Sequence, residues 1–80
     1  MKRSFMGNVS GDRIREQRLR LRLSQSALAA RVQVEGVILE QNMISRIELG
    51  ERIVTDYELR ALSKVLGVST DYLTDNRREE

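Results

Sequence analysis

Two short helical segments lie close together between Ser24 and Glu48, and this stretch limits most strongly the folds that the chain can adopt. In the first, SQSALAARV, Ser24 is a favourable N-cap, and Leu28 and Val32 recur at helical spacing. In the second, QNMISRIELG, isoleucines recur at helical spacing and a glycine follows them. Two consecutive short helices, each with one apolar face, favour an all-helical domain.

Five helices are predicted in all. Their approximate ranges are residues 11–22, starting at Gly11 or Asp12, then 24–32, 41–49, 55–66 and 69–73. The fourth has the clearest start signal, a T-x-x-E capping box formed by Thr55 and Glu58. In the first, Asp12 is predicted near the positive end of the helix dipole. We therefore expect a compact all-α domain over residues 11–74, with a flexible segment at 1–10 and a flexible tail at 75–80.

Composition narrows the possible functions. The 80 residues include no cysteine and no histidine, which removes thiolate ligands, imidazole ligands and the commonest general base. We therefore expect no bound metal, no cofactor and no enzyme activity. No run of 18 apolar residues and no signal-peptide core is present, so we expect a cytoplasmic protein without a membrane partner.

The formal net charge is only +2, but it is unevenly distributed along the chain. Residues 1–31 hold eight basic and two acidic side chains, whereas residues 32–80 hold six basic and ten acidic ones. A basic half is typical of a surface that binds a polyanion. A solvated charged surface is the alternative explanation.

Arg18 and Glu48 each fall on an apolar face of their own predicted helix. Burying either charge alone costs several kcal/mol, whereas a bidentate pair offsets much of that cost. We therefore predict that the two side chains form an ion pair that orients the helix at 41–49. The alternative is that both side chains reach solvent.

The start of the helix at 41–49 carries side chains that suit the reading of DNA bases. The amides of Gln41 and Asn42 can bond adenine N6 and N7, and Arg46 can reach guanine O6 and N7 or a phosphate. Met43 can touch a thymine methyl group. The alternative is an ordinary polar surface, but a helix start that follows another short helix favours a DNA reader.

Contacts with the DNA backbone are predicted around the start of the second helix and along the first. A solvated polar face is the alternative for each of these side chains. The predicted backbone-binding residues are Ser24, Gln25, Arg13, Arg15, Arg22 and Arg52.

The chain resembles the lambda-repressor-like helix-turn-helix regulators, of the Cro/C1 or XRE type. The matching pieces are RIREQRLRLRLSQSALAARV, ISRIELGER and LRALSKVLGVSTDYL, which together cover about residues 11–74. The resemblance implies a five-helix DNA-binding domain in which an arginine of the first helix pairs with the glutamate that ends the third. It also implies base readout by Gln41, Asn42 and Arg46, with Met43 alongside and Gln25 on the DNA backbone.

The connection between the second and third helices departs from the family pattern. The segment VQVEGVILE is longer than the tight turn usual in the family, and we expect it to extend the second helix or to fold onto the core as a loop. Glu40 stands where a serine or threonine cap is usual. A carboxylate at that position faces the DNA phosphates.

These observations predict a sequence-specific transcriptional regulator, a repressor from a bacterium or phage that binds double-stranded DNA as a nucleoid-associated homodimer. The alternative is a protein-interaction module, antitoxin-like or co-activator, on the same fold without sequence-specific DNA binding. The acidic second half and Glu40 favour that alternative. Tyr72 and Leu73 are candidates for a dimer interface, although both residues can equally belong to the core.

Overall fold

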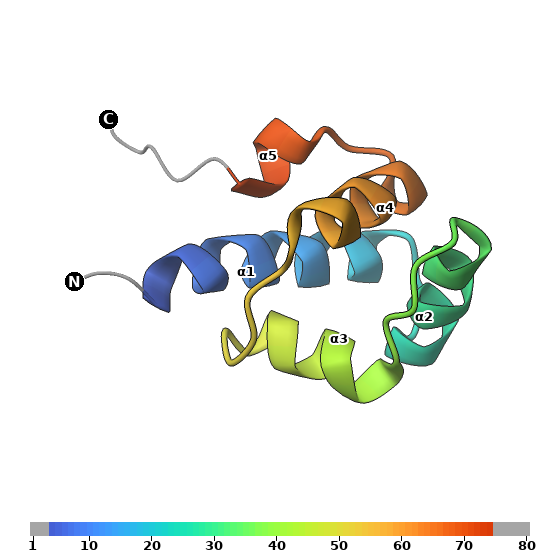
Figure 1. Cartoon of the computed structure of the whole chain (residues 1–80), viewed down its shortest axis with the longest axis horizontal. Helices are drawn as coiled ribbons and strands as arrows, with labels where there is room; N and C mark the ends of the chain where they lie inside the picture. The colour runs from blue at the N-terminus through green and yellow to red at the C-terminus, as the bar shows by residue number, and fades with distance from the viewer. Residues whose placement is uncertain (1–3, 75–80) are drawn as a thin grey trace.

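The computed structural model describes residues 4–74, and within them five α-helices follow one another without a strand. The helices are α1 (Ser4–Arg20), α2 (Gln25–Val34), α3 (Gln41–Glu48), α4 (Asp56–Leu66) and α5 (Thr70–Thr74). Helix α1 crosses the middle of the molecule, with α4 and α5 on one side of it, α3 on the other and α2 at one end (Figure 1). The predicted five-helix, all-α architecture is confirmed. The predicted tail at 75–80 and residues 1–3 lie outside the described residues.

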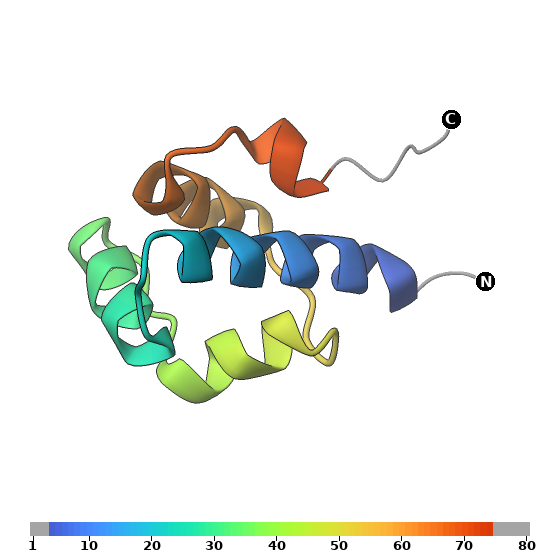
Figure 2. The same ribbon diagram turned by 180° about the vertical axis from the view of Figure 1, so that it is seen from behind.

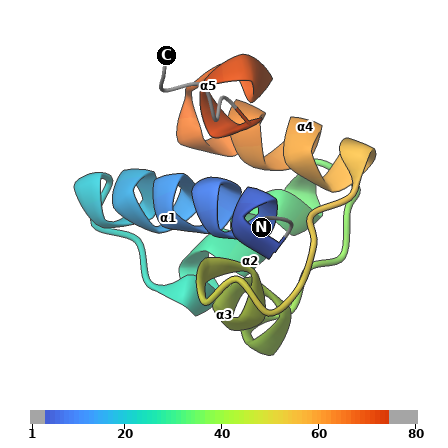
Figure 3. The same cartoon turned by 90° about the vertical axis from the view of Figure 1, so that its left-hand side faces the viewer.

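The core is formed by apolar side chains from all five helices and from the connection before α3. Figure 3, turned by 90° from Figure 1, shows α4 and α5 above α1 and α2 and α3 below it. The buried apolar side chains are Ile14, Leu28, Val32, Leu39, Ile44, Ile47, Leu59, Ala61, Leu62, Leu66 and Leu73. Leu73 is therefore a core residue and not an interface residue, and Tyr72 is half-buried against the core.

Helix α1 begins at Ser4, so the prediction of a start at Gly11 or Asp12 was wrong, and residues 4–10 are helical. Glycine, asparagine and serine in that stretch lower the intrinsic helix propensity, which is why the sequence pattern did not predict a helix there. Ser10 and Gly11 are both buried in the fold. Because the helix starts earlier, Asp12 does not lie at its positive end.

At Gly11, α1 lies close to the backbone of α3. A Cβ atom at this position would collide with the backbone carbonyl oxygen of Ile47 and lie 3.1 Å from the Cα of Glu48. Only a residue without a side chain lets the two helix backbones come so close. The position of the α3 C-terminal turn relative to α1 therefore depends on this glycine.

The ends of α1 and α3 have the same hydrogen-bond pattern but different residues at the left-handed position. After α1, the backbone N–H of Leu23 donates to Arg18 O at 3.0 Å, and Arg22 adopts a φ of 60°. After α3, Gly50 takes the equivalent position with a φ of 79°. An L-residue in this conformation costs about 1–2 kcal/mol relative to glycine, so Arg22 carries strain that Gly50 avoids.

The enlarged connection between α2 and α3 was predicted to extend α2 or to fold onto the core as a loop, and it does both. Its first residues extend α2 to Val34, and the rest forms a loop in which Gly36 has a φ of 89°. Leu39 anchors the loop, because its side chain is buried in the core at 2% exposure. Ile38 beside it is exposed. Val37 is half-buried against the core as well, so the loop is fixed to the core at two residues before α3 begins.

Candidate nucleic-acid interface

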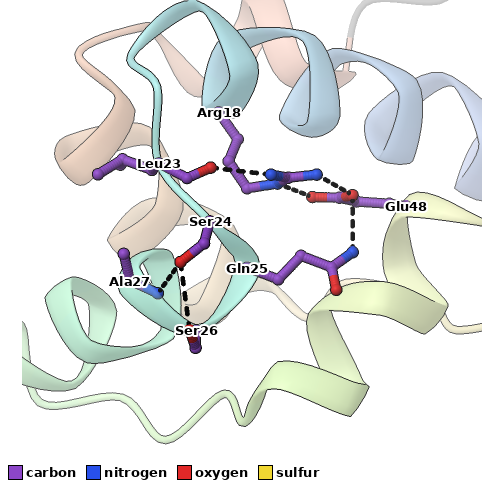
Figure 4. A network of polar contacts seen from close by, with 7 residues as sticks. All are labelled: Arg18, Leu23, Ser24, Gln25, Ser26, Ala27 and Glu48. Atoms are coloured by element: carbon purple, nitrogen blue, oxygen red, sulfur yellow. Dashed lines mark hydrogen bonds and ion pairs between the residues drawn. The ribbon is translucent and has the colours of Figure 1, made fainter.

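Arg18 and Glu48 form the predicted ion pair between α1 and α3 (Figure 4). Arg18 Nε donates to Glu48 Oε2 at 2.7 Å, and Nη2 donates to Oε1 at 2.9 Å. Arg18 Nη1 also donates to the carbonyl oxygen of Leu23 at 2.8 Å, so the buried guanidinium has partners on both sides. The hydrogen bonds to Glu48 raise the pKa of Arg18 despite the opposing effect of burial, and the arginine remains charged.

Gln25, in the first turn of α2, is attached to the same carboxylate. Its Nε2 donates a hydrogen bond to Glu48 Oε1 at 3.1 Å, and the side chain is half-buried (Figure 4). This residue was predicted to contact the DNA backbone. The structure instead gives its amide nitrogen an internal partner, which connects the start of α2 to the end of α3.

The outer face of α3 carries the side chains predicted to read bases. Gln41, Asn42 and Arg46 are exposed, whereas Ile44 and Ile47 on the opposite face are buried. A shallow hollow runs along this outer face and reaches the start of α2. It is lined by Gln25, Gln41, Asn42, Ser45, Arg46, Leu49 and Glu51. The polar tip of α3 therefore points away from the core, and the enlarged connection leaves it exposed.

Met43 does not lie on this outer face. Its side chain is half-buried and packs against the core, and its Sδ accepts a hydrogen bond from the backbone N–H of Glu40 at 3.3 Å. The thioether thus takes the role that a glutamate or glutamine has at this position in a capping box. The structure separates Met43 from the three other residues predicted to read bases.

Arg13 is held on α5 and not beside α3. Its Nη1 donates to the carbonyl oxygen of Tyr72, and its guanidinium carbon lies 4.9 Å from the centre of the Tyr72 ring. Helices α5 and α3 lie on opposite sides of α1, as the view from behind shows (Figure 2). Arg13 was predicted to bind the DNA backbone, but in the structure it stabilises the packing of α5 on α1.

Arg52 also has an internal partner. Its two terminal nitrogens donate to the carboxylate oxygens of Glu58 at 2.9 and 3.0 Å. Glu58 is almost completely buried, and its Oε1 also accepts the backbone N–H of Thr55 at 3.0 Å. The hydrogen bonds from Arg52, and secondarily the one from Thr55, lower the pKa of Glu58. Arg52 therefore supports the start of α4, although we had predicted a backbone contact for it.

The other predicted backbone-binding residues, Arg15, Arg22 and Ser24, are exposed. Ser24 acts as the predicted N-cap of α2, because its Oγ accepts the backbone N–H of Ala27 at 3.0 Å (Figure 4). Arg22 precedes this cap by two residues. Gln25, the first residue of α2, lines the hollow on α3, so the N-terminal end of α2 lies beside that hollow.

The fold and the exposed face of α3 together define a helix-turn-helix domain. A comparison with protein families supports this directly, because the family described as Helix-turn-helix matches residues 14–73. The chain belongs to this family of DNA-binding regulators, in its Cro/C1, XRE-like type. No curated protein and no solved structure matches the chain. Within residues 4–74, no helix is long and apolar enough to cross a membrane.

Proposed function

We propose that this protein is a sequence-specific DNA-binding transcriptional regulator that inserts α3 into the major groove. The single observation that carries the proposal is the division of α3 into two faces. Gln41, Asn42 and Arg46 are exposed on one face, while Ile44 and Ile47 hold the other face against the core. A short helix presented in this way fits the major groove, and its amide and guanidinium groups match the edges of adenine and guanine.

Contacts with the DNA backbone come, in this proposal, from a small number of groups. Arg15, Arg22 and Ser24 are exposed, whereas Arg13 and Arg52 have internal partners. Each phosphate that is neutralised adds about 0.9 to the slope of log affinity against log salt concentration. We therefore expect a salt dependence of only a few units per protomer.

We also propose that the protein binds as a two-fold homodimer and acts as a repressor. Three large apolar side chains, those of Leu49, Ile53 and Tyr57, are mostly exposed where α3 leads into α4. Pairing of two protomers would cover such residues and present two copies of α3 to successive major grooves, about 34 Å apart. A dimer bound at a promoter blocks transcription by occupancy, which is why repression is proposed.

Selection of bound duplexes from a random pool tests the proposal. A defined preferred sequence is expected, with paired half-sites if the protein is a dimer. Gln41→Ala and Asn42→Ala should each relax the preference by about 1–3 kcal/mol at their own position, without changing the melting temperature. Gln33→Ala removes an exposed amide from α2 and is the matched control, which should leave the preference intact. Recovery of no preferred sequence would contradict the proposal.

A protein-interaction module on the same fold is the second candidate. It is favoured by two exposed acidic residues, Glu40 and Glu51, which lie at the two ends of α3. Negative charges in those places oppose the approach of any duplex. Titration of a mixed-sequence duplex at several salt concentrations separates the two candidates, because a protein that does not bind DNA gives no binding signal at any salt concentration.

A further inference from the structure

Glu40 lies at the edge of the proposed reading surface. It is the N-cap residue of α3, its side chain is exposed, and it immediately precedes Gln41 and Asn42. Glu40 and Met43 form a capping box, in which the Glu40 side chain faces the backbone N–H of Met43 and the Glu40 backbone N–H donates to Met43 Sδ at 3.3 Å. Among residues 4–74 its carboxylate takes part in no ion pair, unlike that of Glu48, which is bound by Arg18.

The chemistry of a carboxylate limits what Glu40 can bind in a major groove. An ionised carboxylate only accepts hydrogen bonds, and its two oxygens offer about four acceptor sites. Guanine and thymine present acceptors in the major groove, whereas cytosine presents the N4 amino donor. Adenine also has an amino group there, but its N7 acceptor lies beside it and suits an amide better than a carboxylate.

We propose that Glu40 selects cytosine, by accepting a hydrogen bond from the N4 amino group in the base pair next to those read by Gln41 and Asn42. This inference rests on the proposed function and specifies part of the preferred DNA sequence. A guanine or thymine in place of that cytosine puts an acceptor against the carboxylate. The mismatch then leaves a desolvated charge without a partner, so discrimination is strong.

Simple repulsion between Glu40 and the phosphates is the competing effect, and it makes a different prediction. Repulsion from the backbone lowers affinity for every duplex alike, because phosphates are the same in all sequences. Glu51 provides the matched comparison. It is an exposed glutamate at the other end of α3, it lines the hollow along the outer face of this helix, and it is separated from the amide tip by the length of the helix.

The test is a parallel selection from a random duplex pool with the wild-type protein, E40Q and E51Q. Wild type and E51Q are expected to prefer cytosine at one position next to the adenines. E40Q is expected to lose that preference by about tenfold and to keep the preference at the other positions. Titration with the selected duplex, and with the same duplex carrying thymine at that position, gives the fold-change directly. Melting curves confirm that both variants are folded.

Three results would overturn the inference. In the first, E40Q selects the same sequence with the cytosine intact. In the second, E40Q and E51Q both bind every duplex more tightly by the same factor, which means that charge repulsion alone is at work. In the third, the wild type prefers a sequence without that cytosine. A wild type that binds no preferred sequence at all would instead contradict the proposed function, and this inference with it.

Discussion

The side-chain amide of Gln25 donates a hydrogen bond to Glu48 Oε1 across 3.1 Å, and so connects the first turn of α2 to the last turn of α3. The same oxygen accepts Arg18 Nη2 at 2.9 Å. The buried carboxylate of Glu48, in the last turn of α3, therefore connects this helix to both α1 and α2. These contacts help to hold α3 with its outer face exposed. Four predictions concern this region of the molecule, and a fifth concerns the ion pair at the start of α4.

Gln25→Ala should lower the free energy of unfolding by about 1.5–3 kcal/mol, because it removes a hydrogen bond to a charged and buried group. It should also weaken DNA binding, since α3 loses one of its attachments, while the preferred sequence stays the same. Urea denaturation and DNA titration measure the two effects. Gln33→Ala, at an exposed position near the other end of α2, should change neither.

Arg18→Met alone should destabilise the fold by about 3–5 kcal/mol, because it leaves the Glu48 charge buried without its main partner. The double variant with Glu48→Leu should recover most of that loss, since two apolar side chains of similar size need no solvation. Urea denaturation of the two single variants and the double variant forms the required cycle. Equal losses in the single and double variants would show that the charges themselves stabilise the fold.

Arg22→Gly should raise stability and weaken DNA binding at the same time. Glycine removes the strain of a φ of 60°, for a net gain of about 1 kcal/mol, but it also removes an exposed cation beside the start of α2. The salt slope of DNA binding should fall by about one unit. Arg20→Gly is the control: it removes the same charge at the last residue of α1, where φ is not positive, and should not stabilise the protein.

Acid should weaken the fold through Glu58. The folded protein holds the pKa of this carboxyl below its ordinary value of 4.5, chiefly through the hydrogen bonds from Arg52. The unfolded chain then binds more protons around and below pH 4.5, so stability rises with pH in that range. The contribution is complete above pH 4.5 and is lost as the pH falls through the folded pKa.

Urea denaturation from about pH 3 to 7 measures this dependence. Glu58→Gln should be less stable than the wild type at neutral pH, and the difference should shrink as the pH falls. A difference between the two proteins that stays constant over the whole range would show that Glu58 is not the group responsible. Asp56→Asn is a suitable control, because the ion pair of Asp56 with Arg60 is largely exposed.

Gly11→Ala should destabilise the protein by about 1–3 kcal/mol, although alanine is the better helix former. The added methyl group collides with the carbonyl oxygen of Ile47, so α3 must move away from α1. Thermal unfolding measures the loss, and a weaker affinity for the selected DNA duplex would report the displaced helix. A variant that is more stable than the wild type would contradict this prediction, because it would show that α1 and α3 can move apart at no cost in stability.

The parts of the fold that depend on neighbouring residues could be predicted from the sequence. Ser24 caps α2, and Thr55 begins α4 with Glu58 three residues later, as the sequence indicates. The pairing of Arg18 with Glu48 was also predictable, although the residues are far apart in the chain. Each of these two charges lies on an apolar face of its helix. Because burying either charge alone is costly, an ion pair between them is the expected arrangement.

Features that depend on which distant surfaces meet could not be predicted in this way. Arg13 lies over the ring of Tyr72 because α5 packs against that side of α1, a contact that the sequence around Arg13 and Arg15 does not indicate. Met43 packs against the core, where its Sδ also accepts the backbone N–H of Glu40, although the sequence placed it among the base-reading residues. Gly11 offered one signal, since a glycine inside a helical pattern often marks close packing, and we had interpreted it as a helix start.

The close contact at Gly11 and the shared carboxylate of Glu48 lead to a conclusion about the architecture itself. Helix α3 is attached to α1 at both of these points, so its direction does not depend on the segment joining it to α2 alone. That segment can therefore gain or lose residues during evolution or engineering, provided that a side chain such as Leu39 still fills its place in the interior. In this protein the enlarged connection links α2 to α3, while α1 holds α3 in place.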